Sequence, residues 1–189
     1  SQIGVEVRLE SCRTLGIPVL RRASGGAAIV TGPGCLMYAV VLSFERRPTL
    51  RSSDHAHQFV LGKIVSALDP LVAGVRRRGT SDLAVGDQKF SGNNIRVKRD
   101  HLLYHGTLLY DFDLRLVAEC LRMPPREPDY RQGRGHESFV ANLPVSPTAI
   151  RGAMAAAWKA TEACDAWPGE RTSQLVLERY ARDEWNERR

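Results

Sequence analysis

The stretch that decides the fold is residues 82–93, whose sequence is DLAVGDQKFSGN. Gly86-Asp87 separates two short runs in the pattern of a β-hairpin with a tight turn. Residues 36–44 and 102–110 lie on either side of this stretch and are rich in large apolar residues, as buried strands are. The middle of the chain therefore predicts a β-sheet.

Helical patterns lie before, between and after these strands. Apolar residues at helical spacing, the Ser146-Pro147 start and an alanine-rich run support them. The segments expected to be helical are residues 5–16, 54–73, 113–121, 146–164 and 172–183. A further strand is expected over residues 17–20, and the arginine run 76–78 is expected to lie in a solvated loop. The sequence thus predicts a single α+β domain over residues 1–189.

The composition is that of an ordinary soluble domain, with 43% hydrophobic and 25% charged residues. No apolar run approaches the ~18 residues of a membrane helix, and the first residues do not resemble a signal peptide. No membrane partner is therefore expected, and the expected location is cytoplasmic. The net charge of +6 favours solubility or an anionic partner, either a phosphate-bearing cofactor or an acidic protein. Nucleic acid is not expected, because no binding motif is present and aromatic residues are only 7%.

The four cysteines lie far apart in the sequence and form no CxxC pair. This spacing gives poor support to a zinc site or a disulfide framework. Free thiols are the prediction, and no metal-ligating residues are assigned.

Residues 21–26, RRASGG, are the first segment with chemical potential. Arginine can grip a carboxylate or phosphate in a forked contact, and glycine lets backbone N–H groups approach an anion closely. The alternative is a surface turn with solvated arginines. Both interpretations stay open on residue types alone.

Two further segments lie in predicted strands. Lys89 precedes Ser91-Gly92, where its ammonium could contact a carbonyl or phosphate, although most strand lysines are simply solvated. His105 precedes Gly106 inside an apolar run, and a glycine within a strand often marks the close approach of a ligand or another backbone. A structural histidine is the alternative.

Taken in order, these segments resemble the lipoate–protein ligases. The pattern is Arg-Arg-x-Ser-Gly-Gly, Asp-Leu, Lys-x-Ser-Gly and His-Gly-Thr-Leu-Leu, and residues 179–186 look like the end of that domain. The resemblance implies an α+β fold related to biotin ligases and class II aminoacyl-tRNA synthetases, with a mixed sheet and flanking helices. It also implies that ATP, with Mg²⁺, converts lipoate or octanoate to an adenylate. The acyl group then passes to a lysine of a lipoyl carrier domain, in a 2-oxoacid dehydrogenase E2 subunit or the glycine cleavage H protein.

The resemblance also implies roles for individual residues. Lys89 matches the catalytic lysine that contacts the acyl carbonyl and the adenylate phosphate. Asp82 matches an acidic residue near the nucleotide. The residues implied in binding the acyl group or the nucleotide are Arg21, Arg22, Ser24, Gly25, Gly26, Asp82, Ser91, Gly92, Arg96, His105 and Thr107.

The chain departs from the ligase pattern between residues 27 and 37. Ala27, Thr31-Gly32, Cys35 and Met37 stand where the family has a third glycine, His-Asp and two asparagines. This departure puts ATP use in question. Gly32-Pro33-Gly34 is instead similar to octanoyltransferases, which take octanoyl from acyl carrier protein through a cysteine nucleophile.

Two cysteines are candidates for such a nucleophile, Cys120 and Cys35, with a buried structural thiol as the alternative for Cys120. A third possibility is a non-catalytic module that binds an acyl group or an adenylate. The family also has a longer segment before its Arg-Arg pair. The chain is therefore expected to lack the family's N-terminal segment, as a fragment or because an accessory domain or partner chain supplies it.

Overall fold

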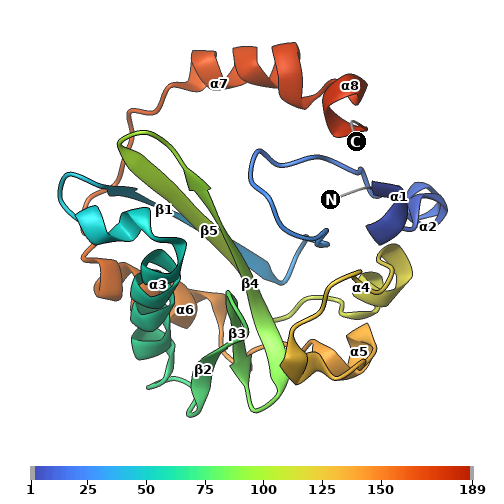
Figure 1. Cartoon of the computed structure of the whole chain (residues 1–189), viewed down its shortest axis with the longest axis horizontal. Helices are drawn as coiled ribbons and strands as arrows, with labels where there is room; N and C mark the ends of the chain where they lie inside the picture. The colour runs from blue at the N-terminus through green and yellow to red at the C-terminus, as the bar shows by residue number, and fades with distance from the viewer. Residues whose placement is uncertain (1–2, 188–189) are drawn as a thin grey trace.

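A computed structural model describes residues 3–187 and contains a five-stranded sheet in the order β1-β5-β4-β3-β2 (Figure 1). The strands are β1 (Cys35–Ser43), β2 (Val75–Arg78), β3 (Asp82–Val85), β4 (Gln88–Val97) and β5 (His101–Leu109). Each ladder between these strands is antiparallel. The parallel pairing that makes the sheet mixed is an isolated bridge between Lys89 and Val140. The predicted α+β class is confirmed, and so are the hairpin and both flanking strands.

One face of the sheet is covered by two helices, α3 (Ser53–Leu68) and α6 (Pro147–Trp158) (Figure 1). The main core lies between them and the sheet, because α3 and the strands place their apolar side chains there. Tyr104, Phe90 and Phe44 are its largest fully buried side chains. Ser146 caps α6 as predicted, since its hydroxyl accepts a hydrogen bond from the Ala149 amide at 3.3 Å.

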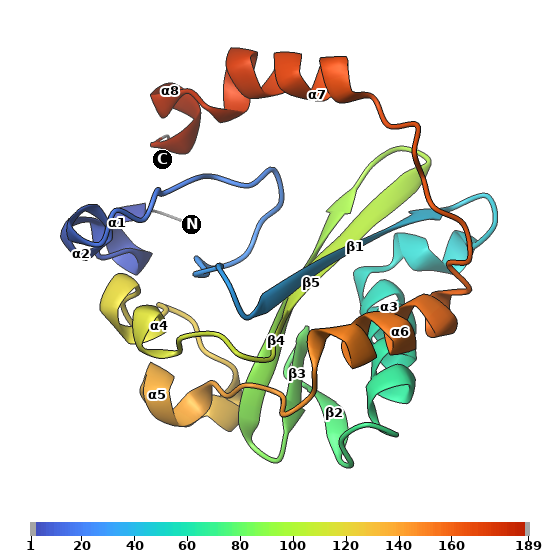
Figure 2. The same cartoon turned by 180° about the vertical axis from the view of Figure 1, so that it is seen from behind.

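The other face of the sheet looks toward the segment that precedes β1, residues 3–34 (Figure 2). A second, smaller core joins that region to the middle of the chain through Cys12, Phe112, Val117, Cys120 and Leu121. Its helices are α1 (Ile3–Glu6), α2 (Leu9–Thr14), α4 (Arg115–Cys120) and α5 (His136–Phe139). Helices α7 (Gly169–Leu175) and α8 (Asp183–Asn186) complete the rim on the same side of the molecule. Short 3₁₀ turns span Pro48–Arg51 and Asp129–Arg131.

Several predicted elements differ in the structure. Residues 17–20 are extended but form no strand, because no neighbouring strand pairs with them in the described part of the chain. The arginine run 76–78 is not a loop but belongs to the edge strand β2, where Val75 fills the core and an edge tolerates exposed charge. Helix α6 ends at Trp158 rather than near residue 164, since Lys159 adopts the left-handed conformation. The expected last helix is broken into α7, a π-turn at Val176–Tyr180 and α8.

The helices described over residues 3–187 are all too short or too polar to span a bilayer.

Candidate active site

A β-bulge in β4 decides which face of the sheet carries Lys89. Asp82 of β3 pairs with Gly92 of β4, and Ala84 pairs with Lys89, so β4 has one residue more than β3 between these pairs. Directly paired residues share a face, and Asp82 and Ala84 share one because they lie two apart. Lys89 and Gly92 therefore project to the same face although they are three apart. The extra residue, Phe90, turns into the main core instead.

The Lys89 ammonium forms an ion pair with Asp82. Its Nζ lies 2.7 Å from Oδ1 of the carboxylate, and the two side chains are 29% and 13% exposed. The other oxygen, Oδ2, accepts a hydrogen bond from the Tyr130 hydroxyl at 2.9 Å. Burial, followed by the Asp82 charge, raises the pKa of Tyr130, so this phenol stays a donor. The lysine predicted from the sequence is thus held over the sheet and does not extend into solvent.

Gly92 leaves the space in which the lysine lies. A Cβ added at Gly92 would lie 3.3 Å from Lys89 Nζ and 3.4 Å from its Cε. The lysine stem therefore crosses directly above this glycine. The Lys-x-Ser-Gly pattern therefore has a steric explanation in this fold: a side chain at position 92 would crowd the side chain of Lys89.

Tyr130 is fixed by the segment that precedes α5, which the sequence predicted only as a surface loop. Arg134 donates to the Tyr130 carbonyl at 2.8 Å and to the Asp87 carbonyl at 2.9 Å. The Arg131 guanidinium is buried over the Phe139 ring, 4.6 Å from its centroid. The segment is therefore an ordered cap on the β3–β4 hairpin that brings a phenol to Asp82.

The loop at residues 21–26 is shaped by its own arginine. Arg22 Nε donates to the Gly25 carbonyl at 3.0 Å, and its guanidinium also donates to the Ala27 carbonyl at 2.9 Å. Arg96 of β4 donates to the Ala23 carbonyl. In this structure Arg22 fixes the shape of the loop and Arg96 ties the loop to the sheet, where the sequence alone suggested that arginine grips a ligand.

Gly26 is required by this geometry, whereas Gly25 is not. Gly26 has φ = +91°, and an added Cβ would lie 2.4 Å from Asn94 Nδ2 and 2.8 Å from the Arg22 guanidinium. A Cβ at Gly25 would meet no described atom within 4 Å. The second glycine of the pair therefore allows the loop to approach Asn94 of β4.

Ser24 and His105 are in direct contact across the loop and the sheet. Ser24 Oγ lies 2.6 Å from His105 Nε2. His105 pairs with Asn94 of β4 and Ala39 of β1, so it projects to the face that carries Lys89 and Gly92. Burial, and then the charge of Arg22, lower the pKa of His105, so the neutral imidazole is favoured.

Thr107 shares this face with an apolar strip on β1. It pairs with Met37, which is 70% exposed, and Val41 further along β1 is 67% exposed. Two residues of the overlying segment, Leu20 and Ile29, are also exposed, by 71% and 51%. The face thus combines a cation, a histidine and uncovered apolar side chains.

Arg21 lies at the edge of this arrangement and links the loop to α8. Its backbone N–H donates to Asn186 Oδ1 at 2.7 Å, and the Trp185 indole donates to the Arg21 carbonyl at 2.7 Å. The motif predicted at residues 184–186 therefore contacts the start of the loop, although the two are about 160 residues apart in sequence.

Ser91 lies on the opposite face of the sheet from Lys89. It is 1% exposed and turns to the core face, where its hydroxyl accepts from Asn93 Nδ2 at 3.0 Å. The prediction placed Ser91 beside the ligand, but the bulge at Phe90 reverses its orientation relative to Lys89. Asn93 also donates to the Ser81 carbonyl at 2.8 Å and accepts from the Tyr38 hydroxyl.

Gly106 serves this buried network and not a ligand. A Cβ at Gly106 would lie 1.8 Å from Asn93 Oδ1. The sequence signal of a glycine within a strand was therefore correct about close approach but not about the group that approaches. Sequence reasoning missed Asn93, Asn94 and Tyr130. The first two stand within the recognised segment, but Tyr130 has no local signal.

The cysteines are free thiols, and the two nucleophile candidates lie in apolar surroundings. Cys120 is 1% exposed in the small core beside Cys12, and burial raises its pKa to about 11. Burial also raises the pKa of the half-buried Cys35, while the Gly32 backbone acts in the opposite sense. A thiolate nucleophile is disfavoured at both positions.

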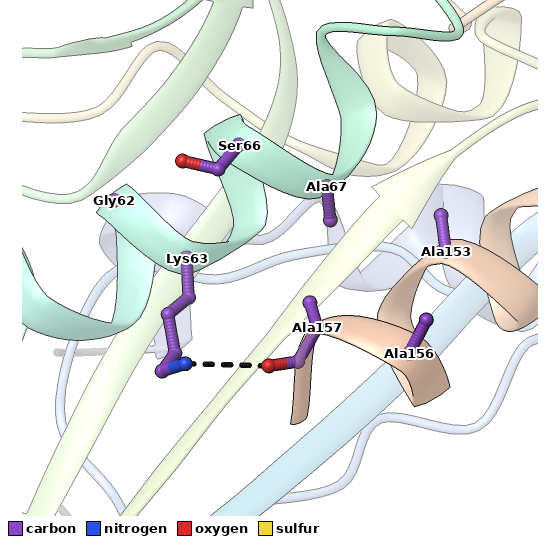
Figure 3. Close-up of a pocket in the computed structure, with 7 residues that line it drawn as sticks. All are labelled: Gly62, Lys63, Ser66, Ala67, Ala153, Ala156 and Ala157. Carbon is purple, nitrogen blue, oxygen red and sulfur yellow. Dashed lines mark hydrogen bonds between the residues drawn. The ribbon is translucent and has the colours of Figure 1, made fainter. Parts of the chain in front are cut away.

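One surface depression lies away from this face. A depression of about 570 Å³ separates α3 from α6, and it is lined by small residues and Lys63, whose Nζ donates to the Ala157 carbonyl at 3.2 Å (Figure 3). A second depression, of about 530 Å³, lies between residues 77–80 and 128–130, beside the Tyr130 contact. Residues 3–187 contain no cluster of three or more His, Cys, Asp or Glu side chains that could hold a metal ion.

Comparison with known proteins agrees with the sequence pattern. The family model of the lipoyl protein ligase A/B catalytic domain matches residues 2–150. A putative lipoate–protein ligase A from Aeropyrum pernix is 32% identical over 164 residues, covering 85% of this chain and 57% of that protein. Octanoyltransferase LipM from Brevibacillus brevis is 26% identical and covers 97% of this chain and 79% of its own length. The chain thus spans little more than half the length of the first of these relatives.

Solved structures share the fold. The bi-partite lipoate protein ligase of Thermoplasma acidophilum, from an archaeal lipoylation system that includes its E2 lipoyl domain, superposes with a TM-score of 0.81 at 22% identity. That match covers 99% of this chain and 77% of the other. A lipoate–protein ligase A bound with ATP gives a TM-score of 0.80 at 22% identity and covers 99% and 78%. Because its family model covers most of the sequence and the recognised motifs meet on one face, the chain belongs to the lipoyl protein ligase A/B catalytic-domain family.

Proposed function

We propose that this chain forms an acyl adenylate from ATP and lipoate or octanoate, and passes the acyl group to a lysine of a lipoyl carrier domain. The observation that carries the proposal is the position of Lys89. Its ammonium lies on the sheet face to which the loop at residues 21–26 is attached, and it is partly buried against Asp82. The Ser24–His105 contact brings that loop to the same face.

Lys89 supplies a fixed positive charge for both half-reactions. Adenylate formation builds negative charge on phosphorus-bound oxygens, and a preorganised ammonium in a partly dry site stabilises that charge better than water does. In the transfer step the same group polarises the acyl carbonyl. Asp82 and Tyr130 keep the ammonium in place before the substrates arrive.

Asp82 is the carboxylate that fits an ATP-borne Mg²⁺. This ion is commonly held by one or two carboxylates together with substrate phosphates, so a single aspartate suits it although no metal cluster is preformed in the described residues. When bound, Mg²⁺ neutralises phosphate charge. The residues of the chain orient the phosphates through the loop backbone and Lys89.

The exposed apolar strip suits the acyl chain. Met37 and Val41 lie on the same face as Thr107 and His105, and Ile29 lies in the overlying segment. Each CH₂ group buried against such a surface contributes roughly 0.8 kcal/mol. A medium-length chain is thus held by apolar contact while its carboxyl group lies toward the polar end of the face.

Lipoyl domains of 2-oxoacid dehydrogenase E2 subunits, or the glycine cleavage H protein, are the proposed carriers. The bi-partite ligase with a similar fold belongs to a lipoylation system with an E2 lipoyl domain, which supports this choice. An accessory domain or partner chain is part of the same proposal, because that relative has two parts.

A second candidate is octanoyl transfer from acyl carrier protein, since octanoyltransferase LipM matches 97% of the chain. That reaction requires a reactive thiolate in this superfamily. The burial and raised pKa of Cys120 count against it.

Intact mass measurement on an apo lipoyl domain separates the candidates. The protein is incubated with the carrier and either lipoate plus Mg²⁺-ATP or octanoyl-acyl carrier protein. We expect a mass gain that requires ATP. A gain from the thioester alone, lost in Cys35→Ser or Cys120→Ser, would favour the transferase. Tight lipoate binding without a gain from either donor would indicate a non-catalytic module.

A further inference from the structure

In the transfer step, the amino group of the carrier lysine must lose protons to an acceptor. The amino group of a carrier lysine is an ammonium ion at neutral pH, and it must lose a proton to become a nucleophile. Lys89 is itself a cation and cannot accept that proton. The Asp82 carboxylate already holds the Lys89 ammonium and the Tyr130 hydroxyl, and in the proposed function its remaining lone pairs hold Mg²⁺. A different group on this face is required.

Ser24 and His105 form the one hydroxyl–imidazole pair that the motifs bring to this face in the described residues. The 2.6 Å contact joins Oγ to Nε2, and both residues are only half-buried. Ser24 belongs to the loop that closes over the face, and His105 belongs to β5 in its centre. A ligand amine that reaches the face from solvent can therefore meet the hydroxyl, with the imidazole directly behind it.

We propose that the Ser24–His105 pair takes the proton from the incoming carrier amine, with the Ser24 hydroxyl touching the amine and His105 receiving the proton at Nε2. The inference rests on the proposed function, since it assigns a role within the same transfer. As the nitrogen bonds to the acyl carbon, the bond from that carbon to the adenylate oxygen breaks and AMP leaves. The nitrogen gives up two protons in all, one before it attacks and one after it has bonded to the acyl carbon. Each passes to Ser24 Oγ while the hydroxyl proton of Ser24 passes to His105 Nε2, which releases it to water before it accepts the next.

The surroundings of His105 favour this role. Burial lowers its pKa and Arg22 lowers it further, so the imidazole is neutral and ready to accept at neutral pH. Three elements pack against it: the loop contributes Arg22 and Ser24, β4 contributes Asn94, and β1 contributes Ala39. Arg96, the next charged residue along β4, is directed to the Ala23 carbonyl. The positive charge of Arg22 also promotes release of the proton from His105 after transfer.

The test uses a nucleophile that needs no base. Synthetic octanoyl adenylate is supplied to the protein with either the apo lipoyl domain or hydroxylamine, which is uncharged at neutral pH. The measured quantity is the ratio of the two acyl-transfer rates. In His105→Gln we expect this ratio to fall by ~10²–10⁴, the usual contribution of a positioned general base. Glutamine keeps a polar side chain beside Ser24 but cannot accept a proton.

His101→Gln is the matched control, because His101 lies on the same strand, contacts Asp100 and is exposed at the end of β5. In this variant the ratio of acyl transfer to the lipoyl domain over acyl transfer to hydroxylamine should equal that of the wild type. A His105→Gln variant that slows both nucleophiles equally overturns the inference but leaves the proposed function standing. A wild-type protein that transfers octanoyl to neither nucleophile overturns both.

Discussion

Lys89 and Asp82 form an ion pair of 2.7 Å between neighbouring strands, and the bulge at Phe90 is what makes it possible. Because this ammonium is the fixed cation of the proposed site, Lys89→Ala should lower acyl transfer by ~10²–10³. The measurement is the rate of carrier mass gain. Far-ultraviolet circular dichroism should show an unchanged fold, since the lysine is partly exposed.

Lys63→Ala is the control for this experiment. Lys63 is also partly buried, but it lies on α3 and donates to the Ala157 carbonyl on the opposite side of the sheet. Its removal should leave transfer near the wild-type rate. Near-normal transfer by Lys89→Ala would remove that lysine from the mechanism.

The two loop glycines should respond differently to substitution. Gly26→Ala forces a side chain into a left-handed conformation and toward Asn94 and Arg22, at a local cost of about 1–3 kcal/mol. The loop must shift, so ATP–pyrophosphate exchange should fall. Gly25→Ala introduces a Cβ that meets no described atom within 4 Å, and it should cause the smaller loss. Equal losses would mean that the backbone geometry of Gly26 is not what the site requires.

Gly106→Ala tests the buried network around Asn93. The new Cβ would lie 1.8 Å from Asn93 Oδ1 and 2.9 Å from the Gly92 carbonyl, so the core must move. Overpacking of this kind typically costs about 1–3 kcal/mol of unfolding free energy. Urea denaturation measures the loss. Gly62→Ala in α3 meets no described atom within 4 Å and should instead raise stability by about 0.5–1 kcal/mol, as helical Gly→Ala changes do.

The thiols provide a test of the transferase alternative. In native protein, iodoacetamide should label the exposed Cys164 well before Cys12 or Cys120, which are buried. Peptide mass mapping follows the order of labelling. Cys120→Ala should retain ATP-dependent transfer. Rapid labelling of Cys120, with matching loss of activity, would restore it as a nucleophile.

Stability should fall as the solution is acidified. Burial lowers the pKa of His57, and the Tyr104 hydroxyl lies 2.8 Å from its Nδ1. The unfolded chain therefore binds more protons than the native state between the lowered pKa and the ordinary value near 6.5. The contribution of His57 is complete above that ordinary value, and it is lost as the pH falls from there toward the lowered pKa.

Urea unfolding at pH 7.5 and at pH 5.5 measures this effect, with His57→Gln as the comparison. The variant should show a smaller difference between the two pH values. His105 and His136 also have lowered pKa values, so some dependence should remain. An identical difference in both proteins would contradict the assignment to His57.

The sequence predicted the parts of the fold that have local signals. Gly86-Asp87 marks the hairpin, and Ser146-Pro147 marks the start of α6, because turn and cap preferences act over a few residues. Residues 17–20 have the residue pattern of a strand and were predicted as one, but they pair with no other strand in the described part of the chain. A strand is defined by its pairing, which one segment cannot reveal.

The sequence grouped residues of the candidate site correctly where the family pattern is contiguous, and it missed neighbours that come together through distant contacts. Lys89, Gly92 and His105 could be placed on one site from their motifs. Tyr130 could not, since it reaches Asp82 across 48 positions of sequence. Ser91 was expected beside Lys89 but faces the core, because strict alternation along a strand fails where an extra residue is inserted.

In β4 the number of residues matters as well as their identity, because the bulge depends on one residue more than β3 has. If Gln88 were deleted and the ladder ran in plain alternation from Gly92, Lys89 would pair with Val85 and its side chain would turn to the core face, toward α3. A scan that only exchanges amino acids would never expose this dependence. A deletion scan should find an abrupt intolerance here, beyond the one expected at the hairpin tip, where Gly86 has φ = +57°.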